Sequence, residues 1–98
     1  MEEQPKGQRV EIELSEDAAQ GIYSNLVIVS HSPSEFVLDF TRILPGLKKA
    51  KVYSRIILSP KHAKSLLKTL DDNINKFEEK FGEIKIDDTT KKEIGFQA

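Results

Sequence analysis

The chain contains no cysteine, and this absence removes several kinds of chemistry at once. Without a thiol there is no disulfide framework, no thiolate metal site and no cysteine nucleophile. The five glycines form neither a phosphate-binding loop nor a Gly-x-Ser-x-Gly elbow. The two histidines, His31 and His62, have no third metal ligand at a recognisable spacing. We therefore expect no catalytic residue, no cofactor and no metal ion.

Long apolar runs are also missing. The longest, LVIV and IIL, fall far below the ~20 residues that are needed to cross a bilayer. The first residues, MEEQPKGQ, are polar and acidic, which is the reverse of a secretory signal. With 38% hydrophobic and 32% charged residues, the composition is typical of a globular protein. We expect a cytoplasmic protein that does not enter a membrane.

The apolar pattern predicts a small antiparallel sheet. Apolar residues alternate with glutamates over residues 10–14, which is typical of a half-buried strand. Three further strands are expected over residues 23–30, 35–44 and 51–58. In the last of them, the period of two places Val52, Ile56 and Leu58 on one face.

A long helix is expected after the last strand. Ser59 is suited to the N-cap and Pro60 to the first helical position, while Gly82 is suited to the end. Apolar residues recur every three or four positions between these points. The helix either lies on its own sheet along its whole length or projects past it. In the second case its later apolar residues form an oligomer interface, and these are Ile74, Phe77 and Phe81.

These elements predict an α+β fold, with an antiparallel β-meander of three to four strands followed by one long amphipathic C-terminal helix. The 98 residues suffice for a single domain. We expect that domain over residues 9–86, a flexible N-terminal tail over 1–8 and a flexible C-terminal tail over 87–98. Ile84 and Ile86 alternate with charged residues and suggest one more short strand.

Charge is distributed unevenly along the chain. Residues 42–68 carry eight basic side chains and no acidic one, although the net charge of the whole chain is −1. This stretch, the basic block, predicts a site for an anion or an acidic partner. Its candidate residues are Lys48, Lys49, Lys51, Arg55, Ser59, Lys61, Lys64 and Lys68.

Three members of the basic block lie near the expected helix N-terminus, where the helix dipole already favours negative charge. They are Lys61, Lys64 and Lys68, and their spacing places them on one helical face. Three explanations stay open. The basic block pairs with the acidic N-terminal strand of the same or a neighbouring chain or is simply solvated, docks an acidic protein, or binds nucleic acid. The last has little aromatic support, because only Tyr23 and Tyr53 are available for stacking.

The segment SHSPSEFVLDF, residues 30–40, gathers serines, a histidine and two acids without predicting a hydrolase site. Ser30 and His31 would point to opposite faces of a strand, so they cannot converge. Ser32, Pro33 and Ser34 are typical of a tight turn. Asp39 is expected to meet a cation such as Arg55 across the sheet.

A resemblance to a known family is carried by four short elements, which are YSN, SPSEFVLDF, the RIILSP junction and the closing FEEKFG. In this order they resemble the bacterial domain-of-unknown-function family 3467 over about residues 10–84. The resemblance implies a small compact protein without enzymatic activity. It also implies a transcription-related partner, since genes of the family lie near those of the large RNA polymerase subunits in some bacteria. The order of a sheet and then a long helix also resembles export chaperones of the SecB type.

We therefore expect a non-enzymatic binding and assembly module that forms a homodimer or a higher oligomer. Its basic block would dock an acidic protein surface, for example on a component of the transcription machinery. Direct binding of nucleic acid through the same residues is one alternative. A chaperone for unfolded chains, which needs an exposed apolar groove, is another.

Overall fold

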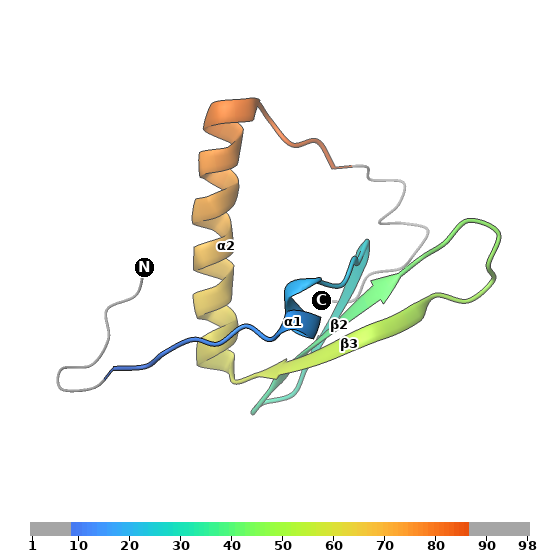
Figure 1. Cartoon of the computed structure of the whole chain (residues 1–98), viewed down its shortest axis with the longest axis horizontal. Coiled ribbons are helices and arrows are strands. Elements are labelled where there is room, and N and C mark those ends of the chain that lie inside the picture. The colour runs from blue at the N-terminus through green and yellow to red at the C-terminus, as the bar shows by residue number, and fades with distance from the viewer. Residues whose placement is uncertain (1–8, 87–98) are drawn as a thin grey trace.

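The computed structural model describes residues 9–86, so the two expected tails, 1–8 and 87–98, lie outside the described residues. The elements follow the order α1 (Glu16–Ala19), β1 (Leu26–His31), β2 (Phe36–Arg42), β3 (Lys51–Leu58) and α2 (Pro60–Phe81) (Figure 1). The three strands form one antiparallel sheet in the order β1-β2-β3. The predicted α+β fold, a meander followed by a long helix, is confirmed.

Both connections within the sheet contain residues that suit turns, in a tight turn over residues 32–35 and in a longer loop over residues 43–50. Between β1 and β2, the Ser32 amide donates to the Glu35 carbonyl at 2.9 Å, and the Ser34 amide donates to the Ser32 hydroxyl at 3.3 Å. The predicted turn at SHSPSE is confirmed. Between β2 and β3, Gly46 has a φ of +83°, which a type II turn after proline requires.

The predicted strand over residues 10–14 is wrong, because these residues belong to no strand and are exposed. The following segment forms the short helix α1, whose Ser15 N-cap accepts a hydrogen bond from the Ala18 amide at 3.1 Å. Alternation shows that a segment can pair in a sheet, but pairing also needs the segment to run along an open edge, and this segment leads away from the strands (Figure 1). Ile84 and Ile86 also lie outside any strand.

The register divides the sheet into two faces, since opposite residues in antiparallel strands point the same way. The first face carries Val27, Val29, His31, Phe36, Leu38, Phe40, Ser54, Ile56 and Leu58. The second face carries Leu26, Ile28, Ser30, Val37, Asp39, Thr41, Val52, Arg55 and Ile57. Both faces are thus rich in apolar side chains, so both need a covering layer.

A β-bulge in β3 separates side chains that were expected to lie together. Phe40 pairs with Ser54, whereas Thr41 pairs with Val52, so Tyr53 is an extra residue in β3. Val52 therefore lies on the second face, opposite to Ile56 and Leu58. The prediction that these three share one face is wrong, because the period of two does not hold across a bulge.

The small core lies where β1 begins and β2 ends. Leu26 and Thr41 are the buried residues of the described chain, at 4% and 2% exposure. Ser24 donates its hydroxyl to the Thr41 carbonyl at 2.8 Å. The Asn25 side chain accepts from the Ile43 amide at 2.8 Å and donates to the Ile43 carbonyl at 3.0 Å. These two residues of the YSN element therefore clamp the end of β2 to the start of β1.

The limits of α2 are those that the sequence predicts. The Ser59 hydroxyl caps the helix by accepting from the His62 amide at 3.2 Å, and Pro60 occupies the first turn. Gly82, with a φ of +101°, ends the helix, and its amide donates to the Glu78 carbonyl at 2.9 Å. The helix leaves the sheet at the end of β3 and stands away from it (Figure 1). Its apolar side is therefore left largely uncovered.

Candidate protein-binding surfaces

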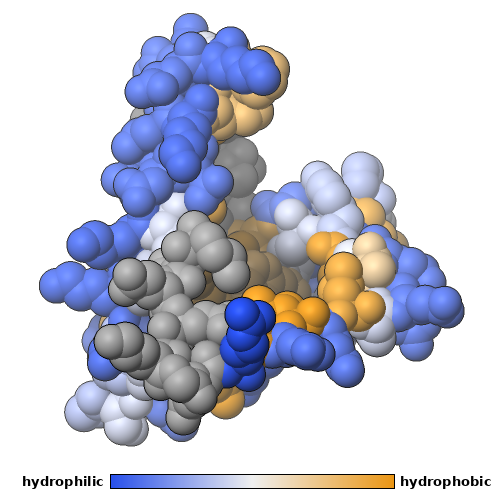
Figure 2. All heavy atoms as spheres, turned by 60° about the vertical axis from the view of Figure 1, so that its left-hand side comes forward, coloured by the Kyte–Doolittle hydropathy of each residue, from blue (hydrophilic) through white to orange (hydrophobic). Residues whose placement is uncertain are grey.

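The most extensive candidate surface is the apolar side of α2, which we call the α2 stripe. It consists of Leu66, Leu67, Leu70, Ile74, Phe77 and Phe81, whose exposed fractions lie between 37% and 66%. The rings of Phe77 and Phe81 lie 4.9 Å apart between centroids and are tilted by 46°. Apolar side chains gather in the angle between α2 and the sheet, while the outer side of α2 is hydrophilic (Figure 2).

The helix does not lie on its own sheet along its whole length, and its exposed apolar residues are not confined to the second half. Leu67 and Leu70, in the first half, are as exposed as Phe77 in the second. The predicted interface residues Ile74, Phe77 and Phe81 lie on the stripe, but they form only part of it. Six adjacent apolar side chains form a continuous exposed surface of the kind that marks interaction sites.

A second apolar feature is the hollow between α1 and the first face of the sheet. It has a volume of about 300 Å³ and is lined by Asp17, Ala18, Gly21, Ile22, Phe40, Ser54 and Ile56. Sequence reasoning missed this hollow because it missed α1. The sequence does contain a signal for α1, because Ser15 is followed by the acidic residues Glu16 and Asp17, which is a pattern typical of a helix start.

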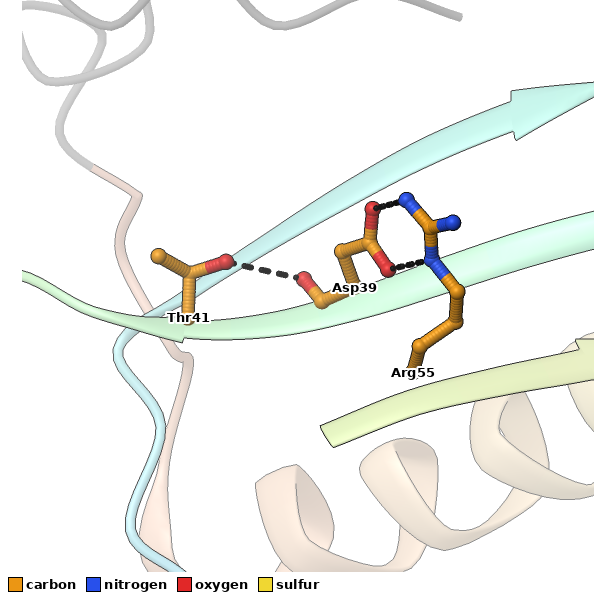
Figure 3. A network of polar contacts seen from close by, with 3 residues as sticks. All are labelled: Asp39, Thr41 and Arg55. Carbon is orange, nitrogen blue, oxygen red and sulfur yellow. Dashed lines mark hydrogen bonds and ion pairs between the residues drawn. The ribbon is translucent and has the colours of Figure 1, made fainter. Parts of the chain in front are cut away.

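Asp39 and Arg55 form an ion pair on the second face, as the sequence predicts (Figure 3). The Arg55 Nε donates to Asp39 Oδ1 at 2.7 Å and one terminal nitrogen donates to Oδ2 at 2.9 Å. These hydrogen bonds are the largest cause of two pKa shifts. They lower the pKa of Asp39 and raise the pKa of Arg55. Of the two side chains, Asp39 is mostly covered, whereas that of Arg55 is 63% exposed. Arg55 therefore still presents an open side to a further acid.

The basic block divides into two groups in space. Lys48, Lys49 and Lys51 lie in or next to the β2–β3 loop, whereas the helical lysines follow the other end of β3. The seven steps from Lys51 to Leu58 span about 23 Å of strand. Lys51 is also held near Tyr53, with its Nζ 5.1 Å from the ring centroid. One continuous basic site is thus not formed.

The helical group lies on the outer face of α2. At about 100° per residue, the centre of Lys61, Lys64 and Lys68 is turned by ~140° from the centre of the α2 stripe. Ser59, a predicted anion ligand, already uses its hydroxyl in the cap and in a 2.8 Å hydrogen bond with the His62 ring. No acidic residue occupies the first turn. The three lysines therefore form a basic face that is independent of the apolar one.

The residues of SHSPSEFVLDF do not converge on a reaction centre. Ser30 pairs with Val37 and His31 with Phe36, so the serine and the histidine point to opposite faces. The His31 ring stacks on Phe36, with 5.3 Å between centroids. Across residues 9–86, no group of three potential metal ligands is found. Over the same residues, no helix is both long and apolar enough to span a bilayer.

Comparison with known proteins gives one result. Residues 1–86 match the family described as "Protein of unknown function (DUF3467)". No curated protein and no solved structure matches the chain. The match covers most of the chain, including the YSN clamp, the SPSEF turn and the RIILSP junction. The chain therefore belongs to this family.

Proposed function

We propose that the chain is a self-associating assembly module that docks an acidic protein surface with the outer face of α2. The observation that carries this proposal is the separation of two surfaces on one helix. The α2 stripe lies on one side, and the lysines 61, 64 and 68 lie on the other. One side can therefore join copies of the chain while the other side stays open for a partner.

The size of the α2 stripe supports self-association. The exposed fractions of its side chains add up to about three whole side chains per copy. Burial of that much apolar surface contributes roughly 5–9 kcal/mol per copy, at 1.5–3 kcal/mol for each side chain. Two copies together supply roughly 10–18 kcal/mol, which is above the middle of the ~4–15 kcal/mol range that association costs in lost freedom. Micromolar or tighter association is therefore within reach of this surface.

The helical lysines support docking of an acidic surface. A helix N-terminus carries partial positive charge within its first turn, so Lys61 is unfavourable there by about 0.3–1 kcal/mol at low salt, and Lys64 and Lys68 extend the same positive face. An acidic partner would turn that cost into a gain, because its carboxylates would meet both the lysines and the dipole. The Lys48, Lys49 and Lys51 group lacks the helix end, so we assign the docking role to the helical group. A component of the transcription machinery stays the candidate partner.

Matched charge reversals test the docking role. We expect affinity capture of the intact protein from its own cells to lose a retained acidic protein when Lys61, Lys64 and Lys68 are all replaced by glutamate. Replacement of Lys48, Lys49 and Lys51 by glutamate is the matched control, since it changes the net charge by the same amount. Loss of the partner from the control alone would contradict the assignment. Equal loss from both would show that overall charge, and not this face, binds the partner.

The nucleic-acid alternative predicts a different salt response. Phosphate contacts release counterions, so binding would weaken steeply as the salt concentration rises. The slope of this dependence, log affinity against log salt concentration, is about proportional to the number of contacts. Titration of duplex and single-stranded nucleic acid at low salt measures this directly. Absence of binding at low salt eliminates the alternative and leaves the acidic protein surface.

A second candidate function, the binding of unfolded chains, is favoured by the exposed apolar angle between α2 and the sheet (Figure 2). It predicts that the protein suppresses aggregation of a denatured test protein. The lysine reversal at positions 61, 64 and 68 should leave that activity intact, whereas Leu70→Asp with Phe77→Asp should remove it. Activity that depends on the lysines would count against this candidate.

A further inference from the structure

Residues 9–14, which we call the N-terminal arm, form a strand-patterned segment outside the sheet. The arm leaves α1 and runs away from the three strands (Figure 1). Ile12 and Leu14 are 81% and 71% exposed. Glu11 and Glu13 alternate with them and are exposed as well. In an extended chain, the arm would present one apolar side and one acidic side.

The sheet offers an edge that fits such a segment. Within residues 9–86, β3 pairs with β2 alone, so among the described strands its other side is an open edge. Its apolar side chains Val52, Tyr53, Ile56 and Ile57 are between 38% and 53% exposed. An open, apolar edge strand is a ready template for a further strand, and folded proteins normally cover or blunt such an edge.

Charge distinguishes β3 from the other open edge. β3 carries Lys51 and Arg55 and no acidic residue, whereas β1 carries no lysine, arginine or acid. The acidic side of the arm therefore complements β3 and has no counterpart on β1. Arg55 is suited to a second carboxylate, because its side chain is 63% exposed although it is already bonded to Asp39.

We propose that the arm of one copy adds to the β3 edge of a second copy as a fourth strand, and that the exchange is reciprocal. This inference rests on the self-association in the proposed function and names the segment that each copy contributes. An antiparallel register with Glu13 opposite Arg55 places Ile12 opposite Ile56 and Leu14 opposite Ser54. The two apolar arm residues then reach the first face, where Ile56 and Ser54 line the hollow beside α1.

The occupant is a second copy because the arm of the same chain points away from β3. The chain enters α1 through Ser15, which is extended with φ −66° and ψ 160° and is fixed as the N-cap. To reach its own β3 edge, the arm would have to reverse at this capped residue. Reciprocal exchange between two copies needs no reversal and gives the two-fold symmetry that is common in dimers.

The absence of native cysteine makes disulfide trapping a direct test. In the variant Ile12→Cys with Ile56→Cys, the proposed register brings the two thiols opposite each other across the dimer. We expect mild oxidation to give a covalent dimer on a non-reducing gel, in at least tenfold excess over the matched control. The control is Ile12→Cys with Val29→Cys, since Val29 lies in the same row of the first face but on β1.

Two results of the trapping experiment would overturn the proposal. A disulfide within one chain, seen as monomer mass with no free thiol, would show that the arm pairs with its own β3. Equal trapping in the control would show that the arm does not select β3. Covalent dimer in the Ile56 variant alone supports the exchange.

Sedimentation equilibrium distinguishes strand exchange through the arm from self-association through the α2 stripe, on which the exchange proposal rests. We expect Ile12→Lys with Leu14→Lys to weaken the dimer at least tenfold while the far-UV circular dichroism stays unchanged, because both residues lie outside the folded elements. If this variant keeps full dimer affinity and Leu70→Asp with Phe77→Asp dissociates, the arm proposal fails and self-association through the α2 stripe stands. A wild-type chain that stays monomeric throughout the micromolar range contradicts both.

Discussion

Replacement of Asn25 by alanine tests whether the YSN clamp holds the sheet together. The Asn25 side chain makes two hydrogen bonds to the Ile43 backbone, at 2.8 and 3.0 Å. Each such bond contributes about 0.5–1.5 kcal/mol net, so Asn25→Ala should cost roughly 1–3 kcal/mol of unfolding free energy. In a domain of this size, 1 kcal/mol lowers Tm by about 4–8 °C. We therefore expect Tm to fall by at least 4 °C.

Thermal unfolding followed by circular dichroism measures this effect, at one fixed protein concentration because association changes Tm. Asn75→Ala is the matched control, since Asn75 is exposed on α2. Alanine has the higher helix propensity, so the control should unfold at the same temperature or slightly above. A Tm for Asn25→Ala that equals that of the control would refute the clamp, and with it our explanation of why the family element YSN stands before β1.

For three further substitutions, the structure predicts the direction in which the stability of the fold changes. Removal of the N-cap in Ser59→Ala should cost about 1 kcal/mol, seen as a lower urea midpoint. Gly82→Ala should cost about 1–3 kcal/mol although a methyl group would meet nothing there, because φ +101° and ψ 169° suit glycine alone. Since Arg55 lowers the pKa of Asp39, the pair stabilises the fold above the unfolded pKa and loses this contribution as pH falls through the folded one. Urea midpoints between pH 7 and pH 2 should therefore fall less steeply for Asp39→Asn than for the wild type, and parallel curves would count against the pair.

The parts of the fold that the sequence predicts correctly are those governed by neighbouring residues. Ser59, Pro60 and Gly82 each act through their own backbone or side chain, so the limits of α2 could be read directly. The pairing of Asp39 with Arg55 followed from alternation, since an acid on a mostly apolar strand needs a cation opposite. The same reasoning separated Ser30 from His31, because adjacent strand residues point to opposite faces.

The errors have non-local causes. The bulge at Tyr53 depends on how β2 and β3 align, which the pattern of β3 alone does not show. The strand expected over residues 10–14 has the right alternation, but the segment runs away from the sheet of its own chain (Figure 1). The basic block is continuous in sequence, yet β3 carries its two halves apart. In each case the missing information is the position of a second element.

Association of two copies through the α2 stripe should affect how tightly the lysine face on the other side of α2 binds a partner. If the α2 stripe and the arm join two copies, the outer faces of both helices stay exposed, so the assembly presents the three-lysine face twice. An extended acidic partner, or one with two acidic segments, would then bind both faces, and the second contact would form at the high effective concentration set by the first. Such avidity can raise affinity by about 10²–10⁴ without any new contact. Dissociation of the dimer should therefore weaken docking even though every lysine is intact. The arm variant Ile12→Lys with Leu14→Lys, which leaves α2 unchanged, separates this effect from damage to the docking face.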